Sequence, residues 1–296
     1  MRRTNEKGVV GEFERISWEE ALDEIASAAA TAIREEGPHT IASGWAHPGS
    51  FALLPCTSIF NKLFGSDQPL LPDCWFDLQF GPVPTVGDMY HALEEDPYES
   101  KVIVLWGENT SVTKPQEWSD SYGKAKNEFG AKLVVIDSRL TETALKADIF
   151  IPVRPGTDAY VAMAMANVII DEGLTDQDFI GKHTFGYEEF AELAKKYTPE
   201  EVEKVSWAPA DKIREVARLY ATSKPSLIAI GRGGNSAGGE KSNAGWLMSR
   251  AICCLPGLCG QFGVKGSGIS IETSSACPSN TCLLYTSPSP RDRTRS

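Results

Sequence analysis

The stretch KLVVIDSRLTETALKADIFIPVRPGTDAY, residues 132–160, decides the fold. Its apolar start, residues 132–137, is typical of a buried parallel strand, and ADIFIPV (147–153) predicts a second strand after a polar turn. The segment TDAYVAMAMANVIIDEG then predicts a helix that Thr157 or Asp158 opens and Gly173 closes. Strands that alternate with helices in this way predict a parallel sheet covered by helices.

The same alternation extends from this stretch in both directions. KVIVLWGENT predicts a strand that runs into a glycine turn, and PSLIAIGRGG predicts another. At the start of the chain, Ser17 and Glu20 have the spacing of a capping box in front of a long helix. The other predicted elements are a short strand at 40–45 and helices at 18–36, 115–130, much of 176–222 and 240–255.

We therefore expect an α/β fold of two interleaved lobes, each with parallel strands flanked by helices. One lobe would comprise residues 1–72 and 206–274, because the strands in TIASGW and SLIAIG could share a sheet. The other, residues 73–205, would be a nucleotide-binding unit. Within residues 275–296, the stretch from about Cys282 onward is basic and aperiodic and resembles the translated read-through of a sequencing adapter. We expect a non-native tail there, with a disordered natural tail as the alternative.

Composition excludes several classes of function. The 296 residues are 42% hydrophobic and 23% charged, as in an ordinary globular protein, and no apolar run is long enough to span a bilayer. A net charge of −11 argues against nucleic acid or an anionic membrane surface as a main partner. The seven cysteines form no CxxC pair, which favours buried thiols in a reducing compartment over a disulfide scaffold or a metal quartet.

Polar residues follow two of the predicted strands where each strand ends. Gly107 and Asn109 come after VIVLW, and DSRLT (137–141) comes after LVVI. In a wound parallel sheet, ligands bind beyond the carboxyl ends of the strands, where a carboxylate can accept hydrogen bonds from a ribose or a guanine edge. The RPGTD turn (154–158) adds a helix N-terminus, which suits anionic groups. The same residue types also cap helices and turns, so spacing alone leaves both interpretations open.

Two further features are ambiguous by themselves. Gly231 and Gly233 form a lone G-x-G after a strand, which is as typical of a tight turn as of a phosphate cradle. Cys74, in the loop-rich segment LLPDCWFDLQFGPVP, is by composition a buried inert cysteine rather than a reactive or metal-bound thiolate. The four histidines have no metal-ligand spacing, and neither a Ser/His/Asp triad nor HExxH is recognised.

Five separated blocks, in order, resemble the molybdopterin guanine dinucleotide oxidoreductases, also called the dimethyl sulfoxide reductase family. The resemblance covers residues 7 to about 272 and includes the whole of residues 130–174. The five blocks are GEFERISWEEALDEIA (11–26), VIVLWGENTSVTKP (102–115), the block 130–174, YATSKPSLIAIGRGG (220–234) and LCGQFGVKGSG (258–268).

The resemblance implies oxygen-atom or hydroxyl transfer at molybdenum or tungsten held by a bis-molybdopterin guanine dinucleotide cofactor. Matched by position, Trp106, Gly107 and Asn109 would line a dinucleotide cleft. Contacts to the guanosine and phosphates of one cofactor half would come from Asp137, Ser138, Arg139 and Thr141, with Gly156, Thr157 and Asp158 holding the guanine and Gly231 and Gly233 completing the cofactor-binding set.

The resemblance also changes the interpretation of Cys74. This cysteine falls where family members place the ligand of the metal, and its spacing to Gly81 fits the members that use cysteine. We therefore expect Cys74 to be the metal ligand and catalytic residue, with Asp73 and Asp77 as rival oxygen ligands. Trp75 stands where relatives that oxidise formate carry His, which makes formate doubtful as the substrate; Trp75, Phe76 and Phe80 are candidate pocket walls.

The family pattern further implies partners that lie outside this sequence. The cysteine motif for a [4Fe–4S] cluster and a C-terminal dinucleotide-binding domain are not found, so we expect the central fragment of a large catalytic subunit, inactive alone. Electrons would pass through that cluster to an iron–sulfur subunit, with a membrane anchor as a further partner and a small molecule as substrate. The compartment stays open: cytoplasmic, or periplasmic if a twin-arginine signal lies upstream.

Two other functions stay open at this point. A non-redox hydratase or transhydroxylase of the same family would use the same cofactor site, and a metal-free dinucleotide-binding α/β protein would use the same sheet edge.

Overall fold

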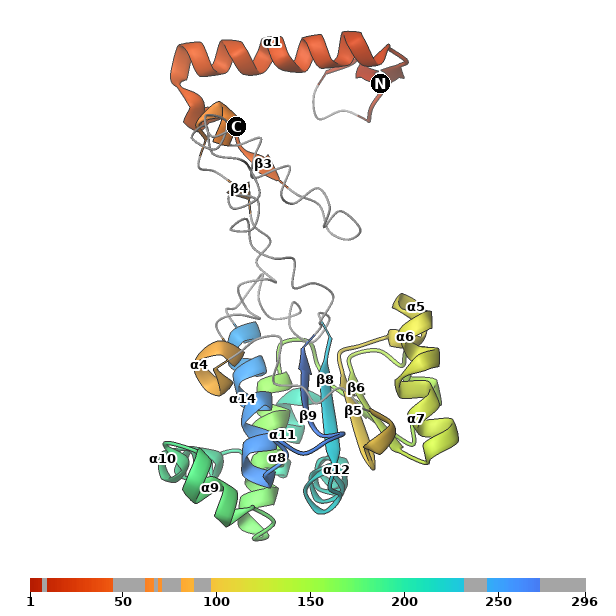
Figure 1. Cartoon of the computed structure of the whole chain (residues 1–296), viewed down its shortest axis with the longest axis vertical. Coiled ribbons are helices and arrows are strands. Elements are labelled where there is room, and N and C mark those ends of the chain that lie inside the picture. Colours follow the sequence, from red (N-terminus) through yellow and green to blue (C-terminus); the bar gives the residue numbers. More distant parts are fainter. Residues whose placement is uncertain are drawn as a thin grey trace, which may run out of the picture. The chain divides into compact units, whose positions relative to one another are not determined.

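The structure is a computed structural model that describes residues 1–6, 10–44, 62–66, 69–70, 81–87, 97–231 and 244–271 (Figure 1). The described residues belong to two compact units, and the chain passes from the first to the second after Leu71.

The first unit is built around one long helix. Strands β1 (Arg2–Arg3) and β2 (Phe13–Glu14) pair antiparallel in front of α1 (Trp18–Glu36). Ser17 caps α1 as predicted, because its hydroxyl accepts a hydrogen bond from the Glu20 N–H at 3.1 Å. A 3₁₀ turn (Pro38–Thr40) follows, and β3 (Ser43–Gly44) pairs parallel with β4 (Pro69–Leu70).

The second unit contains a five-stranded parallel sheet with the order β7-β6-β5-β8-β9. Its strands are β5 (Val102–Trp106), β6 (Lys132–Asp137), β7 (Ile149–Pro152), β8 (Ser226–Ile230) and β9 (Gly268–Ile271). The chain starts in the middle at β5, moves outward to β7, and then returns to lay down β8 on the other side of β5. The direction of winding therefore reverses between β5 and β8, and at such a point the loops diverge and leave room for a ligand.

Alternate residues of the strands face the two sides of the sheet, and each side has its own core. Val104, Trp106 and Ile136 face α8, α12 and α14, whereas Ile103, Leu105 and Val135 face α7. Figure 1 shows α7 on one side of the sheet and α8 and α14 on the other. The helices on these faces are α7 (Tyr122–Phe129), α8 (Asp158–Asp171), α11 (Pro199–Ser206), α12 (Ala210–Thr222) and α14 (Ala244–Cys259).

Shorter elements complete the second unit. The helices are α4 (Pro82–Val86), α5 (Thr110–Thr113), α6 (Pro115–Asp120), α9 (Gln177–His183) and α10 (Tyr187–Ala194), and 3₁₀ turns span Pro97–Glu99 and Ala144–Lys146. In the described part of the chain, no helix is both long and apolar enough to cross a membrane.

The structure confirms the α/β class and the parallel sheet flanked by helices, but it corrects the expected strand pairing. The strand in SLIAIG does not share a sheet with TIASGW: β8 lies between β5 and β9, and β3 pairs with β4. Residues 206–271 thus group with 97–205 rather than with 1–72. The physical reason is burial, since all five residues of β8 are buried and need neighbours on both sides, while TIASGW supplies only a two-residue strand. The predicted tail, 275–296, lies outside the described residues.

Candidate functional site

The first part of the candidate site is the point where β5 and β8 end side by side. The Gly231 N–H donates to the Trp106 carbonyl at 2.9 Å, and the Gly107 N–H donates to the Ile136 carbonyl at 2.8 Å. Gly107 has a φ of 64°, a left-handed conformation that favours glycine. A Cβ on Gly231 would lie 2.4 Å from the Gly107 carbonyl oxygen, so the two strand ends meet with no room for a side chain. The structure therefore brings Gly107 and Gly231 together, whereas Gly233 lies outside the described residues.

The second part is a buried pair that joins β5 to α8. The ring of Trp106, fully buried, donates its Nε1–H to Asp158 Oδ1 at 2.9 Å. Asp158 is the first residue of α8 and only 4% exposed. Thr157 holds the preceding turn closed, because its N–H and its hydroxyl both donate to the Arg154 carbonyl, at 3.0 and 2.7 Å. Gly156 takes a φ of 84° at the corner of that turn. The RPGTD segment thus places a carboxyl group at the carboxyl edge of the sheet.

The electrostatics of this carboxyl group are unusual. The pKa of Asp158 is raised to about 6, chiefly by burial. The hydrogen bonds from Trp106 and from backbone N–H groups act to lower this pKa, and the nearby charge of Asp137 acts to raise it. A carboxylate that has lost its solvation in this way is stabilised by any ligand that donates a hydrogen bond to it. The structure thus brings Asp137 and Asp158 into one acidic, acceptor-rich corner.

The turn after β6 is exposed and carries a cation. Asp137 Oδ1 accepts hydrogen bonds from the Arg139 N–H at 3.1 Å and from the Ser138 hydroxyl at 3.5 Å, which fixes the turn. The Arg139 guanidinium reaches Glu142 at 3.9 Å, and both side chains are more than half exposed. Such a weakly paired surface guanidinium remains available to an anionic group. Arg154, also exposed, begins the turn before α8.

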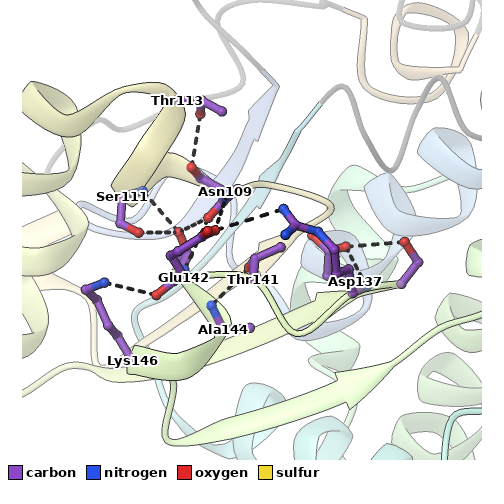
Figure 2. Close-up of polar contacts among 11 residues, drawn as sticks. Asn109, Ser111, Thr113, Asp137, Thr141, Glu142, Ala144 and Lys146 are labelled. Carbon is purple, nitrogen blue, oxygen red and sulfur yellow. Dashed lines mark hydrogen bonds and ion pairs between the residues drawn. The ribbon is translucent and has the colours of Figure 1, made fainter.

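Asn109 and Thr141 lie in a polar network between the loops after β5 and β6 (Figure 2). Asn109 Oδ1 accepts from the Thr143 N–H at 3.2 Å and from the Thr143 hydroxyl at 2.8 Å, and Asn109 Nδ2 donates to Glu142 at 2.9 Å. Thr141 Oγ1 accepts from the Ala144 N–H at 3.1 Å. Both predicted contact residues thus hold the loops in place, and a direct ligand contact by either stays a prediction.

Sequence reasoning missed Thr143, which is the centre of this network. Its hydroxyl also accepts from the Ser111 N–H at 3.0 Å, and its side chain is fully buried. The available signal was topological: the loops that follow two adjacent parallel strands must meet, so polar residues in one loop will find partners in the other.

Replacing Thr143 with Val should lower the free energy of unfolding by about 1–3 kcal/mol. The valine keeps the volume but removes the oxygen, so the part-buried Ser111 N–H loses its acceptor and Asn109 Oδ1 loses a donor. Urea denaturation of the chain measures the loss. Thr113→Val is the matched control, since that exposed hydroxyl only donates to the Asn109 carbonyl; equal losses in both variants would contradict a network centred on Thr143.

The candidate metal ligand is not among the described residues. Cys74, its rivals Asp73 and Asp77, and the three candidate pocket walls all lie in the undescribed segment 71–80. Gly81, at the other end of the Cys-x6-Gly spacing, is buried, and a Cβ there would lie 2.7 Å from the Trp246 carbonyl oxygen of α14. Among the residues that the structure describes, no group of three or more His, Cys, Asp or Glu could hold a metal ion. The role of Cys74 as a metal ligand thus stays a prediction.

The described cysteines are unreactive thiols. Burial raises the pKa of Cys254 to about 11 and that of Cys259 to about 12, and it raises the pKa of Cys253 further still. A thiol with such a pKa stays protonated near neutral pH, which agrees with the structural role expected for most cysteines of this chain.

The chain is similar in sequence to proteins of a known family. Residues 1–282 match the family model "Molybdopterin oxidoreductase". The chain is 32% identical over 287 residues to the probable oxidoreductase YoaE of Bacillus subtilis, an alignment that covers 96% of this chain and 41% of YoaE. It is 30% identical over 313 residues to the dimethyl sulfoxide reductase DmsA of Haemophilus influenzae, covering 93% of this chain and 38% of DmsA.

A solved structure shares the fold. Acetylene hydratase from Pelobacter acetylenicus superimposes with a TM-score of 0.67 at 28% identity, covering 86% of this chain and 34% of that enzyme. The chain therefore spans about two fifths of the length of the curated relatives named above.

Proposed function

Because the chain belongs to the molybdopterin oxidoreductase family, we propose that the carboxyl edge of its sheet binds the guanosine part of a molybdopterin guanine dinucleotide. Family membership implies a molybdopterin cofactor with its metal, and the relatives named above include an oxidoreductase acting on dimethyl sulfoxide and a hydratase acting on acetylene. The dinucleotide form of the cofactor is the part that this chain's own residues support.

The buried carboxyl of Asp158 is the observation that carries the proposal. The polar edge of guanine presents adjacent N–H donors, and one carboxylate can accept from both of them. Asp158 is held in place by Trp106 at the N-terminus of α8, and Asp137 adds a second acceptor beside it. The residues present therefore fit a guanosine in their chemistry. Arg139 and Arg154 supply exposed positive charge for its phosphates.

We further propose a reaction for the full-length protein. When bound, the cofactor supplies a molybdenum or tungsten centre for oxygen-atom or hydroxyl transfer. Cys74 would be a protein ligand of that metal, since a soft thiolate suits a metal already held by sulfur. Trp75, Phe76 and Phe80 would shape the substrate pocket. A [4Fe–4S] cluster would pass electrons to an iron–sulfur subunit, with a membrane anchor as a further partner. The residues of this chain would bind and orient one half of the cofactor.

A non-redox activity is the second candidate, and the likeness to acetylene hydratase favours it. The same guanosine site would serve both activities, because they differ at the substrate pocket and in the need for electron transfer. Turnover of a reduced dye by the full-length protein would select the oxidoreductase; hydration activity without any dye would select the hydratase.

Metal and nucleotide analysis of the full-length protein tests the proposal as a whole. We expect molybdenum or tungsten by mass spectrometry, together with guanosine monophosphate released from the cofactor by acid hydrolysis, in twice the molar amount of the metal for the bis form. A preparation that folds but contains neither metal nor pterin would contradict the proposal and favour a metal-free dinucleotide-binding protein instead.

A further inference from the structure

Trp207 has a backbone conformation that is unfavourable for its residue type. Its φ is 64°, and it is the non-glycine residue with a positive φ in the described part of the chain. A Cβ makes this left-handed region unfavourable, most of all for bulky residues. The side chain is also 58% exposed, so burial offsets little of this cost. Trp207 is the C-cap of α11, a position where a left-handed residue is common but is usually glycine or asparagine. The helix end therefore accounts for the conformation but not for a half-exposed tryptophan, and strain of this kind often marks a functional position.

Hydrogen bonds fix Trp207 beside the turn that precedes α8. The Arg154 N–H donates to the Ser206 carbonyl at 2.7 Å, and the Ala208 N–H donates to the Ser206 hydroxyl at 3.2 Å. Ser206 and Ala208 are both fully buried, so the residue between them is held at a defined place while its ring projects outward.

The topology puts this junction at the ligand edge of the sheet. Helix α12 begins at Ala210 and leads into β8, whose direction is parallel to that of β7. The start of α12 must therefore lie near the carboxyl ends of the strands, and the bond from Arg154 to Ser206 shows the same placement. Trp207 thus stands at the edge where Asp137 and Asp158 converge.

We propose that Trp207 is the aromatic wall of the guanosine site. Its ring would stack on the face of the base, while the polar edge of the same base donates hydrogen bonds to Asp158. This inference rests on the proposed function and deepens it. The corner otherwise offers acceptors and cations, which recognise the edge of a base and its phosphates, whereas the flat face of a base needs an aromatic surface. Trp106 is fully buried, and the half-exposed ring of Tyr160 packs edge-on against Tyr197 at 5.7 Å. Within the described residues, the Trp207 ring makes no such aromatic contact.

Titration of the purified chain with guanosine diphosphate tests the stacking. We expect the wild type to bind this nucleotide, and Trp207→Ala to bind it about 5- to 150-fold more weakly. Trp207→Phe should keep most of the affinity, because it keeps an aromatic face. Nucleotide should also quench part of the tryptophan fluorescence of the wild type, and this part should be missing in Trp207→Phe.

Trp207→Gly separates a binding role from a packing role. Glycine accepts a φ of 64° without strain, so this variant should melt about 2–4 °C higher than the wild type. It should nevertheless lose as much affinity for guanosine diphosphate as Trp207→Ala. A variant that is more stable and yet binds more weakly has not failed to fold. A lower melting temperature with unchanged affinity would assign the ring to packing and overturn the inference.

Asp158→Ala distinguishes failure of this inference from failure of the proposed function. If Asp158→Ala loses binding while Trp207→Ala and Trp207→Gly bind like the wild type, the guanosine site stands and the stacking role is wrong. If the wild-type chain does not bind guanosine diphosphate at all, the guanosine site itself is wrong, and the stacking role falls with it.

Discussion

Gly231→Ala should lower the free energy of unfolding by about 3 kcal/mol. The new Cβ would lie 2.4 Å from the Gly107 carbonyl oxygen and 2.8 and 2.9 Å from Cβ and Cα of Glu108. These are mostly backbone contacts, and hydrogen bonds from Gly231 to Trp106 and from Gly107 to Ile136 hold the strand ends in place. Neither strand can therefore yield without breaking sheet hydrogen bonds. Urea denaturation, with the midpoint and slope fitted together, measures the loss.

Gly181→Ala is the matched control for this substitution. Gly181 is an exposed residue within α9, and a Cβ there would meet nothing within 4 Å. The same chemical change should raise the free energy of unfolding by about 0.5–1 kcal/mol, because alanine is the better helix former. An unchanged urea midpoint for Gly231→Ala would show that the ends of β5 and β8 do not approach each other as closely as described.

Asp158→Asn should remove about 3 kcal/mol of pH dependence from the free energy of unfolding. The pKa of Asp158 rises from an ordinary value of 3.8 to about 6 in the folded chain, chiefly through burial. Between these values the folded chain binds more protons than the unfolded chain. The stability contributed by the protonated group is thus fully present below about pH 4 and is lost as pH rises through about 6. Asparagine binds no proton and can still accept from Trp106.

The difference between the two pH profiles isolates this residue. Carboxylates paired with cations, such as Glu172 with Arg218, have lowered pKa values and give the opposite slope in both proteins. Asp171→Asn is the control, because it removes a carboxylate from the exposed far end of the same helix. If the wild type and Asp158→Asn lose stability in parallel between pH 4 and 6, the buried carboxyl does not titrate there.

The sequence predicted those parts of the fold that depend on local patterns. Apolar runs located β5 and β6, and the helix expected after residue 157 is α8. The helix expected at 115–130 is interrupted at Ser121, whose backbone leaves the helical region between α6 and α7. The place of β8 in the sheet was not predicted, because an apolar strand carries no local mark of which neighbour it will pair with.

The candidate site likewise contains features that local sequence patterns predicted and features that they did not. Asp137 and Thr141 cap turns, as their residue types suggest, and Thr157 with Gly156 closes the turn before α8. The bond between Trp106 and Asp158 joins residues far apart in the sequence, so no spacing rule could reveal it. The conformation of Trp207 was equally hidden, since tryptophan is a residue that no turn pattern assigns to the left-handed region.

The position of β5 at the centre of the sheet also affects how the chain folds while it is being synthesised. β5 pairs on one side with β6, which follows it closely, and on the other side with β8, which starts about 120 residues later. At about 5–20 residues per second, a ribosome needs roughly 6–25 s to deliver the second partner. For that time, the edge of β5 that will later pair with β8 stays exposed on the nascent chain. Such an unpaired edge is a template for pairing between neighbouring chains. Slow growth at low temperature and chaperones that cover strand edges should therefore favour recovery of the folded protein.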